Sequence, residues 1–301
     1  MTKIEWTHRA NTKGESWNMI AGCTKVSPGC ANCYALRDSW RIMNNPKRPE
    51  RYADVCERVG NRPPFWTGLV NLDYDALEQP LHWRKPRTVF VASMSDLFHD
   101  AVPYSFIDRV MRIIASAPQH TYQILTKRAE RMRHYFERGC FEHQGEGAWG
   151  MPLDNVWLGV TAENQEQADR RIPHLLETPA ALRYVSVEPM LGPVDLCEPY
   201  PNREMPGSNI YYPWMIQQLD WIIIGGESGS NARPMDLRWT RDLIGQCHDA
   251  DVPVFVKQLG SAWAQKAGRY TDTPWSVGDP GRKGENIEAW PKDVRVREFP
   301  R

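Results

Sequence analysis

The sequence of 301 residues lacks a long apolar run and lacks an excess of charge of either sign. No stretch approaches the ~20 apolar residues that a membrane-spanning helix needs, and the opening MTKIEWTHRANTKGESW has no apolar core of the kind found in signal peptides. Lys plus Arg and Asp plus Glu each number 37, so the formal net charge is zero and implies no global attraction to nucleic acid or membrane. We therefore expect a soluble cytoplasmic protein without a membrane partner.

Cysteine is also scarce, and its count of seven is odd. In a reducing compartment an odd number argues against a disulfide framework. Four cysteines are scattered, and we interpret them as ordinary buried or partly buried thiols: Cys56, Cys140, Cys197 and Cys247. The other three lie within the stretch GCTKVSPGCANCYA with the spacing C-x6-C-x2-C, namely Cys23, Cys30 and Cys33.

Short β-branched apolar runs alternate with helical patterns along most of the chain, which indicates a parallel sheet. Strands are expected near 17–20, 88–92, 121–125, 155–160, 183–187, 221–224 and 252–256. Helices are expected at 105–116, 129–139, 161–177 and 237–250, and Ser105 with Asp108 has the spacing of a capping box. The fold class predicted is α/β, a partial or complete (βα) barrel of about six to seven parallel strands.

Three segments interrupt this rhythm or follow it. Residues 36–86 are rich in proline and charge and are interpreted as a first helix plus an insertion, and 198–219 as a second insertion. We expect a barrel over 1–260 and a lid or tail over the Gly- and Pro-rich 261–301. Two basic runs, 37–51 and 127–138, fit solvated helix faces better than a phosphate-binding stripe.

Nearly every predicted strand is followed by polar residues, and in parallel α/β folds ligands bind at those strand ends. The repetition favours a single shared site built from Asp96, Lys127, Arg128, Thr161, Glu163, Asn164, Glu188, Glu227, Ser228, Lys257 and Gln258. Gly225 and Gly226 allow a ligand to approach the backbone closely. A phosphate-binding loop is the rival there, but the lysine and the serine or threonine of a P-loop are missing.

The spacing of Cys30 and Cys33 places two thiolates on one metal or cluster, and Cys23 can supply a third across the turn-forming residues 27–29. A structural zinc site needs a fourth ligand, for which His8 upstream is the nearest candidate, and a redox C-x2-C pair leaves Cys23 unexplained. A [4Fe–4S] cluster on three cysteines keeps one iron open to an amine and a carboxylate. The cluster is the favoured interpretation, with zinc and three independent thiols as the alternatives.

A three-cysteine loop after the first strand of a βα barrel resembles the radical S-adenosylmethionine superfamily, whose usual spacing is C-x3-C-x2-C. The longer spacing, and Asn32 before the last cysteine with Tyr34 after it, are similar to a narrower group of phage and prophage proteins described as radical-SAM-like. The resemblance covers nearly the whole chain and rests also on SMSDLF (93–98), LTKR (125–128), GVTAEN (159–164), SVEPML (186–191), GGESG…ARP (225–234), VKQLG (256–260) and the closing WP-DVRVREFP.

The resemblance implies a [4Fe–4S] cluster on the three cysteines, S-adenosylmethionine on its open iron and an electron from a flavodoxin- or ferredoxin-type donor. It implies cofactor contacts from Tyr34 (adenine), from Ser93, Ser95 and Asp96 (amino group), from Lys127 or Arg128 (carboxylate) and from Thr161, Glu163 and Asn164 (ribose). A helix cap or surface group is the alternative role for each. Four residues farther along the barrel are expected to face the substrate, of which the first three are the catalytic candidates: Glu188, Glu227, Lys257 and Ser228.

For the substrate, the resemblance implies thymine hypermodification of viral DNA in the host cytoplasm. The expected step is an isomerisation of an amino-acid-bearing thymine that moves a glycyl attachment from nitrogen to the α-carbon, on modified DNA or on a nucleotide. Two alternatives remain open. One is another DNA-modifying or repair-type radical enzyme, such as a relative of spore photoproduct lyase, and the other is a zinc-stabilised phage binding protein without catalysis.

Overall fold

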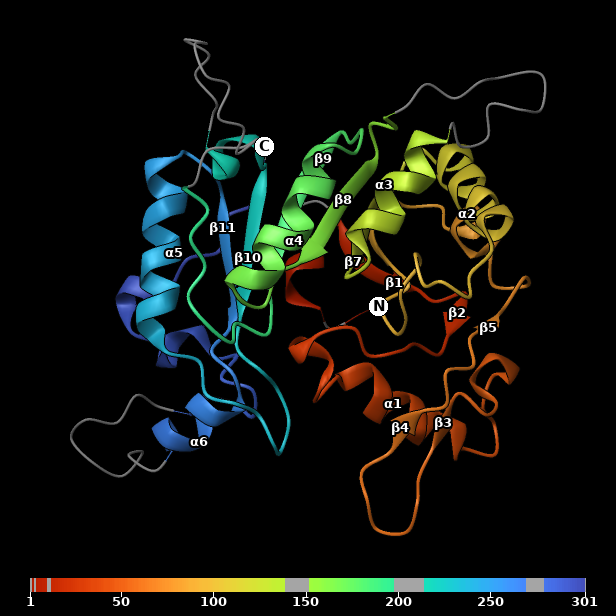
Figure 1. Cartoon of the computed structure of the whole chain (residues 1–301), viewed down its shortest axis with the longest axis horizontal. Helices are drawn as coiled ribbons and strands as arrows, with labels where there is room; N and C mark the ends of the chain where they lie inside the picture. Colours follow the sequence, from red (N-terminus) through yellow and green to blue (C-terminus); the bar gives the residue numbers. More distant parts are fainter. Residues whose placement is uncertain are drawn as a thin grey trace. The chain divides into compact units, whose positions relative to one another are not determined.

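The computed structural model describes residues 2, 4–9, 12–138, 152–197, 214–268 and 279–300. Its main sheet has seven strands in the order β1-β6-β7-β8-β9-β10-β11, which is also their order along the chain (Figure 1). These strands are β1 Lys13–Trp17, β6 Arg87–Val91, β7 Thr121–Thr126, β8 Val156–Thr161, β9 Leu182–Val187, β10 Trp221–Gly225 and β11 Val254–Gln258. Parallel pairing in this order, with β1 and β11 at the two ends, makes a partial (βα) barrel and confirms the predicted fold class.

Six α-helices lie in the described part of the chain. Their bounds are α1 Tyr34–Met43, α2 Tyr104–Ser116, α3 Ala129–Glu137, α4 Gln165–Leu176, α5 Leu237–Asp249 and α6 Ser261–Gly268. Single 3-10 turns lie at Glu5–Thr7, Pro28–Cys30, Glu50–Tyr52, Gln79–His82, Met215–Gln218, Ile287–Ala289 and Lys292–Val294. Among the described residues no helix is long and apolar enough to cross a membrane.

The capping box predicted for α2 is wrong. Pro103 is the N-cap, with the extended backbone that proline favours, so the helix starts at Tyr104 and Ser105 is its second residue. Asp108 points elsewhere, and its carboxylate accepts from the Tyr135 hydroxyl at 2.9 Å and from Arg138 at 3.1 Å. The helix is held instead by its buried apolar face, which includes Phe106, Ile107, Val110, Met111 and Ile114.

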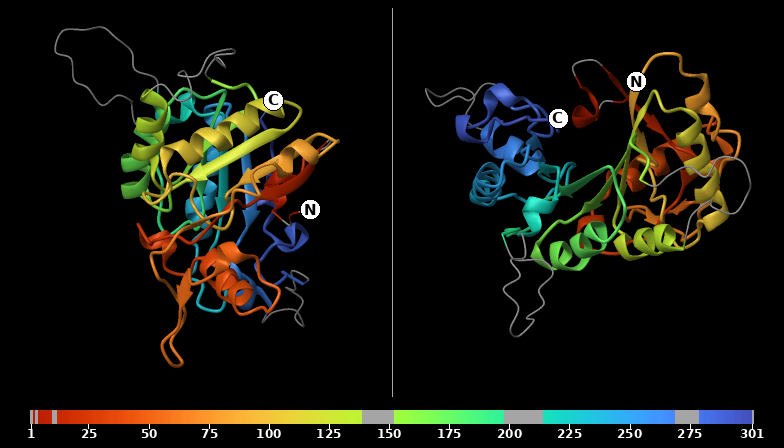
Figure 2. Two further views of the ribbon diagram at one scale, coloured as in Figure 1. Left: turned by 90° about the vertical axis from the view of Figure 1, so that its right-hand side faces the viewer. Right: turned by 90° about the horizontal axis from the view of Figure 1, so that it is seen from above.

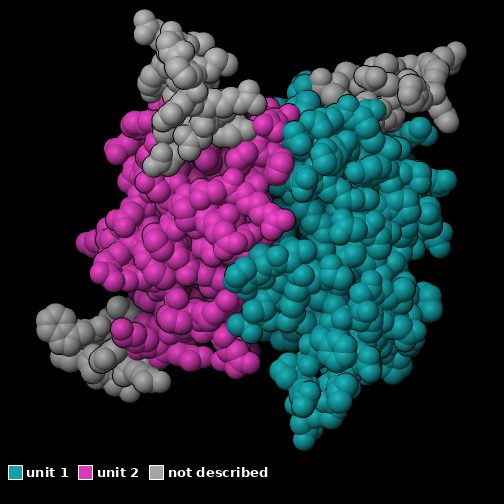
Figure 3. Space-filling view, viewed as in Figure 1, with its two compact units in different colours: residues 1–159, 178–182 teal, residues 160–177, 183–301 magenta. Residues whose placement is uncertain are grey.

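The chain divides into two compact units, residues 1–159 with 178–182 and residues 160–177 with 183–301, which we call unit 1 and unit 2 (Figure 3). In unit 1, β1, β6 and β7 pair in parallel, with Trp17 opposite Val91 and Val91 opposite Ile124. Helices α2 and α3 lie along one face of these strands (Figure 2). All three of those strand residues are buried, so the core of unit 1 lies against its sheet.

Unit 1 also contains the segment between α1 and β6, which forms two short antiparallel ribbons. Strand β2 (Ile20–Ala21) pairs with β5 (Asn71–Leu72), and β3 (Cys56–Glu57) pairs with β4 (Phe65–Trp66). Helix α1 joins them in a small apolar cluster of Ala21, Leu36, Tyr52, Val55 and Cys56. The predicted insertion is thus packed onto the chain that carries the three cysteines. The first strand of the main sheet was predicted at 17–20 but lies earlier, at Lys13–Trp17. Ile20 belongs instead to β2.

In unit 2, β9, β10 and β11 pair in parallel, and α5 connects the last two. The C-terminal residues extend this sheet, since the Val256 amide donates to the Val296 carbonyl and the Glu298 amide to the Val254 carbonyl, both at 2.9 Å. These contacts cover the outer edge of β11, which would otherwise expose unpaired backbone groups. Whether 261–301 acts as a lid stays a prediction. Most of the second insertion lies outside the described residues, and Cys140 lies outside them too.

Candidate metal centre and strand-end site

The cysteine loop leaves β2 through Gly22, whose φ of 94° lies in the left-handed region. A Cβ at this position would lie 2.1 Å from the carbonyl oxygen of Leu69, so only glycine fits between β2 and the strand it pairs with. Cys23 follows directly. The ribbon of β2 and β5 therefore determines where the first of the three thiols is placed.

The other two thiols are positioned by short local structures. Cys30 ends a 3-10 turn, in which its amide donates to the Ser27 carbonyl at 3.0 Å, and the Ser27 hydroxyl lies 3.9 Å from its sulfur. Cys33 is the N-cap of α1. It also packs against the apolar cluster that contains Cys56. All three thiols are free and partly buried.

The pKa of the Cys23 thiol is raised to about 11, chiefly by burial. The negative charges of Asp96 and Cys33 act in the same direction, and Arg128 opposes them. Cys33 is therefore close enough to Cys23 for their charges to interact. A thiol with so high a pKa is neutral at pH 7 and becomes a thiolate on binding a metal.

Among the described residues no group of three side chains forms a ready-made metal site, so the geometry by itself supports neither zinc nor a cluster. A mononuclear zinc site needs its ligands to converge on one ion, and among the described residues no three His, Cys, Asp or Glu side chains do so. His8 is held elsewhere, with Nδ1 accepting from the Gly14 amide at 3.3 Å and Nε2 within 2.9 Å of the Thr2 carbonyl. In a [4Fe–4S] cluster each thiolate binds a different iron, so its three cysteines need not converge on one ion.

Asp96 follows β6 and is a buried hydrogen-bond acceptor with no oxygen to spare. Its Oδ1 accepts from the Thr126 hydroxyl at 2.7 Å and the Phe98 amide at 3.0 Å, and its Oδ2 accepts from Arg128 at 3.0 Å and the Lys127 amide at 3.2 Å. These donors use the four lone-pair sites that a carboxylate offers. Asp96 therefore organises the strand ends of unit 1, and its role as an anchor for a cofactor's amino group stays a prediction that these contacts do not favour.

Arg128, the N-cap of α3, points at the cysteine loop. Its Nη2 donates to the hydroxyl and the carbonyl of Thr24 at 2.8 and 3.3 Å, and its Nη1 lies 3.9 Å from the sulfur of Cys23. His99 Nε2 lies 2.9 Å from the same Thr24 hydroxyl. Because Nδ1 of His99 accepts from the Ala101 amide at 3.1 Å, the proton of a neutral ring is on Nε2 and is donated to Thr24. Sequence reasoning missed Thr24 and His99, although both lie within or next to motifs that it singled out.

The remaining predicted cofactor residues of unit 1 differ in whether their side chains already have a hydrogen-bond partner. The Tyr34 hydroxyl donates to the Ser93 carbonyl at 2.5 Å, and the Ser93 hydroxyl donates to Asn18 at 3.1 Å. The Ser95 hydroxyl oxygen is buried and has no hydrogen-bond partner among the described residues. The ammonium of Lys127 is partly exposed and makes no hydrogen bond or ion pair with the described part of the chain. Ser95 and Lys127 are thus the groups of this set left for a ligand.

At the end of β8 in unit 2, the three predicted ribose contacts have structural partners. Asn164 caps α4, with its side chain accepting from the Gln167 amide at 3.1 Å. Glu163 is completely buried and pairs with Arg171 at 2.9 Å, and Arg171 also donates to the Thr161 carbonyl at 2.7 Å. These contacts favour the helix-cap and packing alternatives over ribose binding.

The catalytic candidates lie at the ends of β9, β10 and β11 in the same unit. Lys257 Nζ donates to both carboxylate oxygens of Glu188, at 2.7 and 3.0 Å, and the pair is about one-fifth exposed. Gln258 Nε2 lies 3.3 Å from Glu188 and donates to the Gly226 carbonyl at 2.8 Å. A Cβ on Gly225 would crowd the Glu188 side chain at 3.1 Å. The structure therefore brings Glu188, Lys257 and Gln258 together, as predicted for a strand-end site.

Glu227 is the second carboxylate of this group. It is buried and accepts from the backbone and side chain of Arg233, at 2.8 Å and 2.5 Å for the closest contacts, which raises the pKa of the guanidinium. The charge of Glu163 contributes to the same shift, so both carboxylates act on one guanidinium. Arg233 belongs to the GGESG…ARP phrase, but sequence reasoning did not assign it a role. Ser228, the fourth predicted substrate contact, is partly buried and makes no side-chain hydrogen bond within the described chain.

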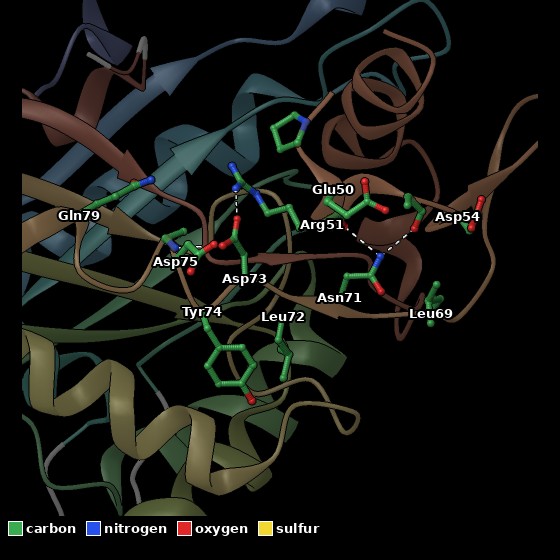
Figure 4. Close-up of a pocket in the computed structure, with 13 residues that line it drawn as sticks. Glu50, Arg51, Asp54, Leu69, Asn71, Leu72, Asp73, Tyr74, Asp75 and Gln79 are labelled. Carbon is green, nitrogen blue, oxygen red and sulfur yellow. Dashed lines mark hydrogen bonds and ion pairs between the residues drawn. The ribbon is translucent and has the colours of Figure 1, made fainter. Parts of the chain in front are cut away.

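An open pocket of about 810 Å³ lies in the insertion of unit 1, apart from these residues (Figure 4). Asn71 donates there to the Arg51 and Ala53 carbonyls at 3.1 and 2.7 Å, and Arg51 pairs with Asp73. Its charged lining is mostly acidic, which suits neither a phosphate nor a carboxylate. None of the predicted site residues lines it.

Comparison with known proteins identifies the family of this chain. A family model described as "Protein of unknown function (DUF5131)" matches residues 1–290. The chain belongs to the DUF5131 family. No curated protein and no solved structure matches it. Since the DUF5131 description assigns no activity, the cysteine loop and the strand ends of this member are the basis for a functional proposal.

Proposed function

We propose that this chain is a radical S-adenosylmethionine enzyme in which Cys23, Cys30 and Cys33 hold a [4Fe–4S] cluster. The observation that carries the proposal is one loop with three free, partly buried thiols, two of which interact electrostatically and one of which faces a buried guanidinium. When bound, the cluster and cofactor supply a 5′-deoxyadenosyl radical that removes hydrogen from an unactivated C–H bond. A flavodoxin- or ferredoxin-type protein is the proposed electron donor.

Within unit 1, the contacts divide the proposed cofactor residues into two groups. Asp96 accepts from Nη1 of Arg128, and Nη2 of Arg128 donates to the cysteine loop, so the pair positions the loop, while Nε of Arg128 is buried without a partner among the described residues. Lys127 carries the cation that remains, and we assign to it the carboxylate of the cofactor's methionine end, a charge-assisted contact. The Ser95 hydroxyl, which lacks a partner among the described residues, and Tyr34, whose hydroxyl donates to the Ser93 carbonyl, complete the proposed cofactor contacts.

Within unit 2, Glu188 and Lys257 are the proposed catalytic pair. Lys257 Nζ makes two short contacts with the Glu188 carboxylate, and the pair is exposed enough for a ligand to reach it. Either member can then exchange its partner for a charged or hydrogen-bonding group of the substrate. Glu227, held by Arg233 on its side-chain and backbone donors, is more rigid and suits a positioning role.

For the substrate we propose a glycyl-bearing thymine in DNA or in a nucleotide, acted on in the host cytoplasm. Support comes from the surface of the insertion, where exposed cations outnumber exposed acids between residues 41 and 62 and an exposed aromatic ring follows three residues later in the chain. These groups are Arg41, Lys47, Arg48, Arg58, Arg62 and Phe65. Cations with an aromatic side chain fit a nucleic acid better than an acidic protein surface.

Metal content tests the proposal first. Prepared without oxygen, the wild-type protein is expected to be brown and to contain about four irons and four sulfides per chain. Cys30→Ala should lose most of both, whereas Cys197→Ala, which removes a partly buried thiol of unit 2 outside the cysteine loop, should keep them. Colourless wild-type protein with one zinc would refute the cluster and favour a zinc-binding protein.

The substrate is tested separately with iron-loaded protein. Reduced enzyme is incubated with the cofactor and glycyl-thymine DNA, and the digested nucleosides are analysed by mass spectrometry. The isomerase predicts a new nucleoside of unchanged mass and altered retention, which Glu188→Gln should reduce strongly. Formation of 5′-deoxyadenosine without any new nucleoside would refute this substrate and leave the radical chemistry intact.

A further inference from the structure

Arg128 connects the end of β7 with the cysteine loop more than one hundred residues earlier in the chain. Only 7% of its side chain is exposed, and its contacts reach across the loop backbone to the sulfur of Cys23. A guanidinium stays protonated at every pH that the fold survives. A fixed positive charge with an N–H group therefore faces one of the three proposed cluster ligands.

This charge cannot turn away from the sulfur without losing several hydrogen bonds. Asp96 holds Nη1 at 3.0 Å, and the hydroxyl of Thr24 holds Nη2 at 2.8 Å. Asp96 is fixed in turn by Thr126, and the Thr24 hydroxyl by the neutral ring of His99. The guanidinium is thus fixed on both sides before anything binds.

We infer that Arg128 is a positioning residue that raises the reduction potential of the centre held by the cysteine loop, an inference that rests on the proposed function. Reduction adds one negative charge to a cluster and its thiolates. A buried positive charge and an N–H group directed at a ligand sulfur stabilise that reduced state more than the oxidised state. The carboxylate of Asp96 contacts the same Nη1 of Arg128, and its negative charge acts on the Cys23 sulfur in the opposite direction, so the inference concerns the contribution of Arg128 and not the net effect of the pair.

The inference predicts graded shifts of the reduction potential, which a purely structural role of Arg128 would not produce. In Arg128→Met the positive charge is gone while Asp96 remains, so the potential should shift to more negative values. In Arg128→Lys the charge remains without the fork that spans Asp96 and Thr24, so the shift should have the same sign and be smaller. Arg131→Met is the matched control: it removes a cation of the same helix that contacts the Val102 carbonyl and not the loop, and it should leave the potential unchanged.

The experiment is a potentiometric titration of each iron-loaded protein without cofactor, followed by electron paramagnetic resonance, with iron and sulfide measured on the same samples. A graded negative shift, Met larger than Lys, supports the inference. Iron-loaded variants with the wild-type potential would overturn it, and so would an equal shift in Arg131→Met. If Arg128→Met does not hold iron, Arg128→Lys decides. Absence of iron from the wild type would instead refute the proposed function, so the two failures are distinguishable.

Discussion

Replacing Asp96 by asparagine is the sharpest test of how the cysteine loop is held. The substitution keeps the shape of the side chain and one acceptor oxygen, which can still serve the Thr126 hydroxyl and the Phe98 amide. The new amide nitrogen, however, faces two donors, the Lys127 amide and the Arg128 guanidinium. Two hydrogen bonds are lost, and a buried cation is left without its counterion.

The magnitude follows from burial. Both side chains of the Asp96–Arg128 pair are 7% exposed, so water neither screens the pair nor replaces the lost partner. Removing one member of such a buried pair costs about 3–5 kcal/mol. This is a large fraction of the roughly 5–15 kcal/mol that holds a domain folded. Removing the cation as well, in Asp96→Asn with Arg128→Met, should recover part of the loss because no unpaired charge then remains buried.

Urea unfolding followed by circular dichroism and by tryptophan fluorescence measures the effect. The control is Asp38→Asn, whose surface pair with Arg41 at 3.7 Å should contribute less than about 1 kcal/mol. We expect Asp96→Asn to lower the unfolding midpoint of unit 1 strongly and the control to leave it nearly unchanged. A cost below about 1 kcal/mol for Asp96→Asn would refute the view that this pair holds the loop.

Two further predictions concern pH and packing. Burial lowers the pKa of His120, whose neutral ring accepts from the Arg87 amide on Nδ1 and lies 3.1 Å from the Pro80 carbonyl on Nε2. The unfolded chain therefore binds a proton at higher pH than the folded chain does, so stability should fall as the pH drops below about 6.5, and His120→Gln should flatten this slope in urea midpoints measured from about pH 8 to pH 5. A Cβ on Gly226 would lie 2.5 Å from the Leu259 carbonyl oxygen, so Gly226→Ala should cost about 1–3 kcal/mol. Gly245→Ala, in α5 with nothing within 4 Å of the new Cβ, should be neutral or stabilising. Urea unfolding measures both variants, and equal midpoints for Gly226→Ala and Gly245→Ala would contradict this packing.

The strands and helices could be predicted because their signals are local. Each β-branched run from residue 88 onward became a strand of the main sheet to within two residues, and α2 and α5 have the bounds that apolar periodicity indicated to within one residue. The first strand was placed too late because the apolar residues near Ile20 belong to β2, which pairs with the insertion. That antiparallel ribbon depends on a partner about fifty residues away, which periodicity cannot identify.

The roles of the site residues were less predictable, because a strand-end position shows that a residue is polar but not what it contacts. Lys127 and Arg128 are adjacent and equally charged in the sequence. In the fold the guanidinium is buried against Asp96, and the lysine ammonium makes no hydrogen bond or ion pair with the described part of the chain. The contact of Glu163 was equally unpredictable from its position after a strand. Its partner Arg171 lies two helical turns later and closes the carboxylate off from any ligand.

Burial separates two kinds of charge at these strand ends. The pairs Asp96–Arg128 and Glu163–Arg171 are closed to solvent, and such pairs bring little net stability because desolvation opposes their attraction. Their role is positional, since each pair fixes a loop or a helix against the end of a strand. Glu188–Lys257 is partly exposed, so it can exchange partners at lower cost. A rigid pair beside the cysteine loop of unit 1 and an exchangeable pair in unit 2 are what the proposed enzyme needs if its metal centre must be held still and a substrate must enter and leave.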